Sequence, residues 1–170
     1  MGMTPEQFFE SFVEWNLEDC FDKPGDIRRG FNAAVSVSHL ADQYFTYAKR
    51  HRPDLVAQFQ TLGEFVEHLS LKTAGAFRDV RSVSNVYKHL YTDVGKFSEH
   101  STVASCGSIE SLYLEEDEDI QALKKDDVRG DDQEGRMCVI VKRKDGSQFE
   151  LLPALESVVN CFRELVCSLA

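Results

Sequence analysis

One face of a predicted helix carries the side chains best suited to chemistry in this sequence. The stretch SNVYKHLY, residues 84–91, lies within a helical pattern that covers about residues 73–94. With an advance of about 100° per residue, four polar side chains of this helix fall within one wedge of about 80°. They are Arg78, Arg81, Asn85 and His89, and Lys88 borders them. Because a histidine can transfer a proton and an arginine can stabilise negative charge, this face is either a reaction site or a polar contact between helices.

The helix predicted for about residues 26–50 carries polar side chains that could contact that face. Asp42 is its single formal charge between residues 30 and 48, and a helix so poor in charge is expected to be buried nearly all round. Its polar side chains nevertheless cluster on one side; they are Asn32, His39, Asp42 and Gln43. A buried carboxylate needs a partner, because leaving it unpaired in an apolar interior is costly. We therefore hypothesise a polar seam between the two helices, formed by His39 and Asp42 on one side and by Asn85, Lys88, His89 and an arginine on the other.

Capping residues and apolar spacing predict the helices. Thr4, Pro5 and Gln7 form an N-terminal capping pattern before an apolar stripe, and Thr61 and Glu64 form a second one. The stripe after the first cap contains Phe8, Phe9, Phe12, Val13 and Leu17. The predicted helices cover about 4–20, 26–50, one bent or two short segments between 53 and 70, and 73–94, ending near Gly95.

The second part of the chain changes to a β pattern. SIESLYLE, residues 108–115, is compatible with a short strand, and two β-rich runs flank the turn signal Asp145-Gly146. Pro153 is expected to start a final helix over 153–169. The predicted fold is mainly α: an up-and-down helical bundle with a small antiparallel β-hairpin element before a C-terminal helix. We expect one domain, 1–170, divided into a helical bundle (4–94), a β element (109–152) and the C-terminal helix (153–169).

Most of the net charge of −10 comes from one segment. Residues 115–134 contain ten acidic and three basic residues, so the rest of the chain is nearly balanced. Such a run is typical of a solvated loop. The basic clusters at 28–29, 49–52 and 142–144 are modest and are expected to be helix ends or a strand face. DNA is therefore not an expected partner.

Cysteine usage and hydropathy favour a cytoplasmic protein. The five cysteines contain no CxxC pair, which suits reduced thiols rather than a disulfide framework or a zinc site. Cys106, in the small-residue stretch STVASCGS, is expected in a loop. The sequence contains no apolar run of about 18 residues, so no membrane span is predicted. The stretch MGMTPEQ lacks a secretory signal pattern. No GxGxxG or Walker A motif predicts a nucleotide cofactor, so none is expected.

Three segments in order resemble the HEPN superfamily (higher eukaryote and prokaryote nucleotide-binding domains). They are FNAAVSVSHLADQYF, FRDVRSVSNVYKHLY and VKRKDGSQFELLPALESVVNCFRELV. The chain looks most like small uncharacterised bacterial relatives with an Asn-x-x-Lys-His signature, which Asn85, Lys88 and His89 match. The resemblance covers nearly the whole chain.

The resemblance implies a helical bundle that is often dimeric and, in active members, a metal-independent ribonuclease. Those members carry an arginine, four to six intervening residues and a histidine on one helix. The histidine would transfer protons at the ribose 2′-hydroxyl or the leaving oxygen, and the arginine would stabilise the phosphorane. Here Arg81 and His89 are separated by seven residues and Arg78 and His89 by ten, so the chain departs from the pattern.

Three functions follow as hypotheses. The first is a homodimeric interaction module without catalysis, in which the polar seam fixes packing or assembly. The second is a ribonuclease acting on RNA or a nucleotide, with His89 as acid–base group, Arg81 or Arg78 as anion clamp and Asn85 beside them. The third is a metal site in the bundle that uses His39, Asp42 and His89 with His68 or His100, although no Glu-x-x-His motif of bundle metal sites occurs.

Overall fold

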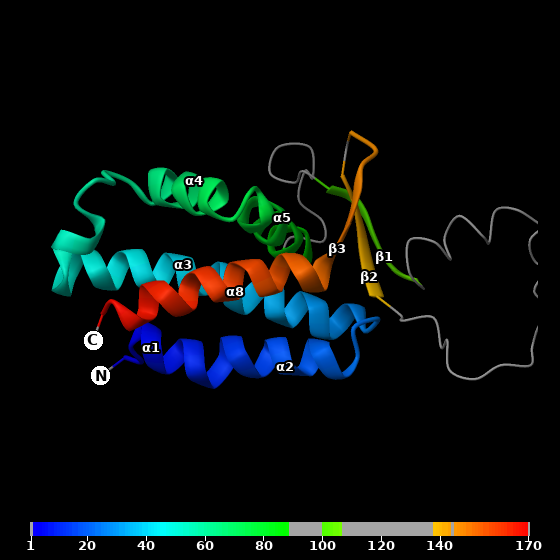
Figure 1. The fold of residues 1–170 in the computed structure, drawn as a ribbon, viewed down its shortest axis with the longest axis horizontal. Coiled ribbons are helices and arrows are strands. Elements are labelled where there is room, and N and C mark those ends of the chain that lie inside the picture. Colours follow the sequence, from blue (N-terminus) through cyan, green and yellow to red (C-terminus); the bar gives the residue numbers. More distant parts are fainter. Residues whose placement is uncertain (1, 89–99, 107–137, 144, 170) are drawn as a thin grey trace, which may run out of the picture.

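The protein is a helical bundle with a small antiparallel sheet at one end (Figure 1). The computed structural model describes residues 2–88, 100–106, 138–143 and 145–169. Its helical segments are α1 (Pro5–Phe8), the π-helical η1 (Phe9–Glu14), α2 (Trp15–Asp22), α3 (Ile27–His51), the 3-10 turn η2 (Pro53–Val56), α4 (Leu62–Lys72), α5 (Ala76–Lys88) and α8 (Leu151–Cys167). Its strands are β1 (His100–Cys106), β2 (Cys138–Arg143) and β3 (Gln148–Glu150). The predicted mainly α bundle, with a hairpin before the C-terminal helix, is confirmed.

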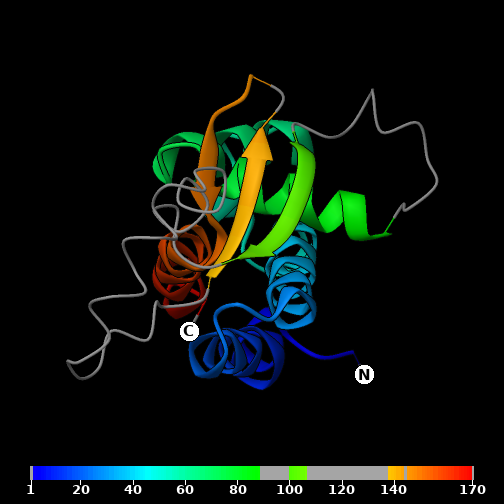
Figure 2. The ribbon, with the colours of Figure 1, turned by 90° about the vertical axis from the view of Figure 1, so that its right-hand side faces the viewer.

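The helices form layers around one apolar core. The N-terminal segment α1–η1–α2 lies along one side, α3 and α8 occupy the middle, and α4 and α5 lie on the opposite side (Figures 1 and 2). Most of the largest fully buried side chains come from α3, α4, α5 and α8, among them Leu40, Tyr44, Phe65, Phe77 and Phe162. Residues from several layers meet in this cluster, so burial rather than local propensity holds the bundle together.

The N-terminal segment buries every fourth residue, and a π-helical turn keeps these residues on one face of the helix. Its buried row is Pro5, Phe9, Val13 and Leu17, spaced by four. In an α-helix each step of four residues drifts by about 40°, so such a row would wind away from the core. The wider turn of η1 reduces this drift. The prediction that Phe12 belongs to the buried stripe is wrong. Its side chain is 45% exposed, because the four-residue repeat of buried positions places it beside the buried row.

Helix α3 confirms the prediction of a long, charge-poor helix. Asp26 caps it, accepting hydrogen bonds from the backbone N–H groups of Arg28 (2.9 Å) and Arg29 (3.3 Å). Small side chains such as Ala34, Ala41 and Ala48 are fully buried, which lets neighbouring helices approach closely. The helix ends with Lys49, Arg50 and His51, where positive charge favours the C-terminal end of the helix dipole.

The link between α3 and α5 is a short 3-10 turn followed by a separate helix. Thr61 caps α4 through its hydroxyl, which accepts from the N–H of Glu64 (3.2 Å). The Glu64 carboxylate accepts instead from the N–H of Gln60 (2.7 Å), one residue before the position that a capping box requires. The next helix starts at Ala76 rather than at 73, because Ala74 and Gly75 adopt positive φ angles of 51° and 92° that interrupt the helix. Its predicted end near Gly95 lies outside the described residues.

The sheet has three strands in the order β1-β2-β3, and both pairings are antiparallel. The predicted hairpin is β2–β3, with Gly146 at φ 90° and its N–H donating to the Arg143 carbonyl (3.0 Å). Strand β1 corrects the expectation of a loop at Cys106, whose Cα pairs with that of Cys138. This strand has no strong β pattern of its own and depends on pairing with β2. The predicted strand 108–115 and acidic loop 115–134 lie outside the described residues.

The C-terminal helix begins at Leu151, two residues before the predicted Pro153, because β3 runs directly into it. Proline is tolerated in the first turn of a helix, where its missing N–H has no intrahelical partner. Gly30 of α3 packs against this junction: a Cβ there would lie 2.9 Å from Cδ2 of Leu151. None of the helices in the described part of the chain is long and apolar enough to cross a membrane.

Candidate functional site

An ion pair joins α3 to α5 at the centre of the predicted polar seam. Nη1 of Arg81 lies 3.0 Å from Oδ1 of Asp42 and also donates to the carbonyl of Ser38 at 3.5 Å. The side chains are 24% (Arg81) and 40% (Asp42) exposed, so the pair is half-buried. The structure therefore provides the arginine partner that the sequence predicted for Asp42. This arginine's charge is already balanced within the protein.

His39 does not join this pair. Its ring lies 5.5 Å from that of Phe8, on the side of α3 that faces the N-terminal segment, and the residue is exposed. The hypothesis that His39 faces α5 is therefore wrong. A rotation of about 300° separates residues 39 and 42 on a helix, which leaves them about 60° apart and lets them reach different neighbours.

The other arginine and the asparagine line a shallow hollow beside the ion pair. Arg78, Arg81 and Asn85 border it together with Ser82 and α4 residues, and its volume is about 170 Å³. Arg78 is exposed and Asn85 half-buried. The structure thus brings three of the four predicted catalytic residues to one place. His89 lies outside the described residues, as does the side chain of Lys88, so the predicted acid–base group is not located.

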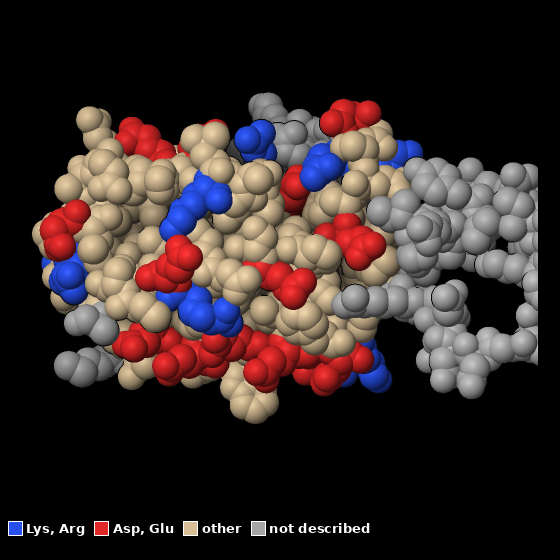
Figure 3. Space-filling view, in the orientation of Figure 1, with Lys and Arg blue, Asp and Glu red and all other residues tan. Residues whose placement is uncertain are grey.

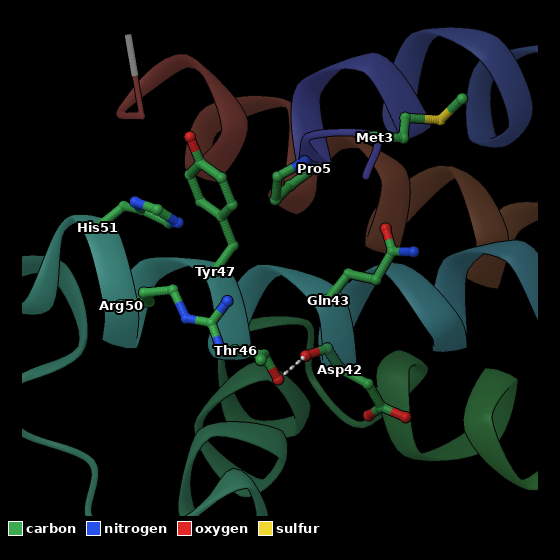
Figure 4. A pocket seen from close by; sticks show the side chains of 8 residues that line it. All are labelled: Met3, Pro5, Asp42, Gln43, Thr46, Tyr47, Arg50 and His51. Carbon is green, nitrogen blue, oxygen red and sulfur yellow. Dashed lines mark hydrogen bonds between the residues drawn. The ribbon is translucent and has the colours of Figure 1, made fainter. Parts of the chain in front are cut away.

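A larger hollow of about 360 Å³ lies along the C-terminal half of α3 (Figure 4). The rings of Tyr47 and His51 lie there with centroids 4.5 Å apart and an angle of 36° between their planes, and Gln43 and Arg50 also line the hollow. Figure 4 shows the Asp42 carboxylate turned away from Tyr47 and His51. The backbone carbonyl of Asp42 accepts a hydrogen bond from the Thr46 hydroxyl (2.8 Å). The contacts in this hollow hold neighbouring side chains of α3 in place, and they include no nucleophile paired with a base.

The described residues contain no group of three or more histidine, cysteine or acidic side chains able to hold a metal ion. Of the side chains proposed for a metal site, His39 contacts Phe8, and the ring of His68 lies 4.9 Å from that of Phe59. The side chains of His89 and His100 lie outside the described part. The placement of His39 and Asp42 next to different helices does not support the metal hypothesis.

A second ion pair, between α5 and the sheet, was not predicted from the sequence. Arg143, at the end of β2, donates two hydrogen bonds to the carboxylate of Asp79, at 2.9 Å from Nε and 2.5 Å from Nη2. It also lies over the ring of Phe149, with its guanidinium carbon 4.5 Å from the ring centroid. The hydrogen bonds to Asp79 raise the pKa of Arg143 above its ordinary value. The cluster 142–144 is thus partly a tertiary contact and not only a solvated strand face.

Cys20, Cys161 and Cys167 are free thiols, and the first two are buried. Burial raises the pKa of Cys20 to about 12, and the negative charge of Asp19 adds to the effect. Burial likewise raises the pKa of Cys161. Because the thiolate is the reactive form, these two residues are poor nucleophiles. Cys167 is exposed.

The N-terminal segment presents an unusual surface. Residues 5–22 contain six acidic and no basic residues. Four glutamates and an aspartate repeat every four residues and form an acidic row: Glu6, Glu10, Glu14, Glu18 and Asp22. Figure 3 shows acidic side chains gathered along this edge of the molecule. Large apolar side chains stay exposed on the same segment, Trp15 at 67% and Phe12 and Phe21 each at 45%. Like charges four residues apart destabilise a helix, and acidic residues near a helix C-terminus oppose its dipole, so this row of charges is unfavourable for the helix itself.

Comparison with known proteins gives no relative. No family model, curated protein or solved structure matches the chain.

Proposed function

We propose that this protein is a non-catalytic helical interaction module. The observation that carries the proposal is the exposure of Trp15 and Phe12 on a helix whose other flank is packed against the core. Exposed aromatic side chains are typical of protein-binding surfaces. One polar pair joins α3 to α5: the Asp42 carboxylate balances Arg81 at 3.0 Å, which suits a packing role better than an anion clamp.

A homodimer is part of this proposal, supported by the resemblance to bundles that are often dimeric. Size-exclusion chromatography with light scattering on the full chain measures its mass in solution. A mass of twice the 19.3 kDa chain is expected. A mass of one chain at every concentration tested would refute self-association and leave interaction with another protein as the remaining form of the module.

A ribonuclease is the second candidate, because Arg78, Arg81 and Asn85 line one hollow on the helix that leads to His89. Incubation of labelled single-stranded and hairpin RNA with the protein in EDTA tests it. The interaction-module proposal predicts intact RNA. Cleavage that persists in EDTA, is lost in His89→Ala and survives in His68→Ala would establish the enzyme instead. His68 serves as the matched control because it is an exposed histidine on α4, outside the hollow.

A further inference from the structure

The hollow along the C-terminal half of α3 is large enough for a small molecule. Its volume is about 360 Å³, which lies within the range of small-molecule sites. Met3 and Pro5 line one side of it. Most of its α3 residues share one face of the helix, at positions i, i+3, i+4, i+7 and i+8: Gln43, Thr46, Tyr47, Arg50 and His51.

The end of α3 brings two uncommitted basic side chains to this hollow. Four basic residues stand in a row there, and two of them are engaged elsewhere: Nζ of Lys49 and Nη1 of Arg52 each donate to a backbone carbonyl at 3.2 Å. The other two, Arg50 and His51, line the hollow, and neither forms a hydrogen bond or an ion pair within the described part of the chain. The donors of the Arg50 guanidinium therefore remain available to a ligand.

The acidic residue at the edge of the hollow does not offset the charge of Arg50. Figure 4 shows Gln43, Tyr47 and His51 turned to the side of α3 where Pro5 lies, whereas the carboxylate of Asp42 points away from them. That carboxylate is already paired with Arg81 at 3.0 Å. Among the described residues that line the hollow, Asp42 is the only acidic one, so the site favours an anion.

The amide of Gln43 is a further uncommitted group. Its Oε1 atom is buried and has no hydrogen-bond partner in the described part of the chain. The large majority of buried polar side-chain atoms are hydrogen-bonded, so an unpaired one needs a reason. Because an amide both donates and accepts, a polar ligand in the hollow would supply the missing partner.

We propose that this hollow binds a small phosphate monoester. The planar fork of Arg50 can hold two phosphate oxygens, and the imidazole N–H of His51 can donate to the third. A phosphate monoester fits this site better than a carboxylate, because it has three terminal oxygens and about 1.5–2 negative charges at neutral pH. The ring of Tyr47, with Met3 and Pro5, offers apolar surface to the organic group that carries the phosphate.

Phenyl phosphate is the probe, and isothermal titration calorimetry on the full chain measures its affinity. Inorganic phosphate lacks the ring and benzoate lacks the phosphate, so these two anions test the two parts of the site separately. We expect phenyl phosphate to bind about fivefold or more tightly than either. Equal binding of benzoate would overturn the preference for phosphate, and equal binding of inorganic phosphate would overturn the apolar part. No binding of phenyl phosphate at about 10 mM would refute the site.

Matched variants locate the bound anion. Arg50→Gln is expected to weaken phenyl phosphate binding about tenfold or more, because hydrogen bonds to charged groups are strong. Arg28→Gln is its control, since it removes the same charge from an arginine that is 74% exposed at the other end of α3, and it should change the affinity less than about twofold. Tyr47→Leu should weaken binding of phenyl phosphate more than binding of inorganic phosphate. Thermal melts followed by circular dichroism confirm that each variant is folded.

The outcomes keep this inference separate from the proposed function, beyond which it goes. Equal affinity of Arg50→Gln and Arg28→Gln would refute the site. Binding that is lost in Arg78→Gln but retained in Arg50→Gln would place the anion in the hollow beside α5 and also refute it. None of these results bears on the interaction module, because the hollow contains neither Trp15 nor Phe12.

Discussion

The ion pair between Arg143 and Asp79 is expected to be the strongest single polar contact between the sheet and the helices. It joins the end of β2 to α5, the helix that also carries Arg81 and Asn85. The two hydrogen bonds are short, and the Asp79 side chain is only 11% exposed, against 31% for Arg143. Removing the guanidinium would take both of these hydrogen bonds away from a nearly buried carboxylate.

The magnitude follows from that burial. Breaking a buried ion pair by deleting one partner costs about 3–5 kcal/mol, and hydrogen bonds to charged groups are worth about 1.5–3 kcal/mol. Water can reach about a third of Arg143, so we expect Arg143→Met to lower the free energy of unfolding by about 3 kcal/mol. Methionine keeps an apolar stem beside Phe149 and limits the loss to the polar contacts. For a domain of this size the melting temperature should fall by about 6–12 °C.

A double-mutant cycle and a matched control test this value. Urea unfolding followed by far-ultraviolet circular dichroism is suitable, since exposed Trp15 is a weak reporter of core unfolding. The cycle of Arg143→Met with Asp79→Leu should give a coupling energy of about 2 kcal/mol. Arg163→Met should cost less than about 1 kcal/mol, because its pair with Glu14 is 49% and 36% exposed. If Arg143→Met costs no more than Arg163→Met, the reasoning from burial is refuted.

Three smaller effects follow from other parts of the structure. Asp42→Asn should destabilise the protein by about 1 kcal/mol, because the partner Arg81 is half-buried; an unchanged urea midpoint would show that solvent replaces the pair. The pKa of Cys20 is about 12 in the folded protein against an ordinary thiol value of 9.0, so its contribution to stability is complete below about pH 9 and is lost as the pH rises toward 12. The stability advantage of the wild type over Cys20→Ala should therefore shrink between about pH 9 and pH 12, and an advantage that stays constant would contradict this assignment. Glu10→Gln should raise stability by about 0.5 kcal/mol at low salt, because Glu10 has acidic neighbours four residues away on both sides, and the gain should fade in about 1 M salt. A gain that is independent of salt would exclude charge repulsion as its cause.

The sequence located most helix starts because capping is a local interaction. Thr4, Asp26 and Thr61 each satisfy backbone N–H groups two or three residues ahead, so the signal and its effect lie in the same few residues. The hairpin at Gly146 was predictable for the same reason, since a tight turn depends on the residues within it.

The candidate site was only partly predictable. A carboxylate in a charge-poor helix implied a cationic partner, and Arg81 is that partner. The sequence did not determine which way His39 turns, because residues 60° apart on a helix meet different neighbours depending on how the helices pack. The acidic row was visible in the sequence as a four-residue repeat, but in a regular α-helix that repeat would spiral around the segment.

By itself, the sequence determined the helices of the bundle, their caps, the hairpin and the need for a partner at Asp42, because each depends on residues close together in the chain. The tertiary structure alone decided the pairing of β1 with β2, the Arg143–Asp79 contact 64 residues apart and the π-helical turn that aligns the acidic row beside exposed Trp15. Those features depend on which distant surfaces meet when the core is buried. Such choices reflect the free energy of the whole packed molecule rather than the preference of any short segment.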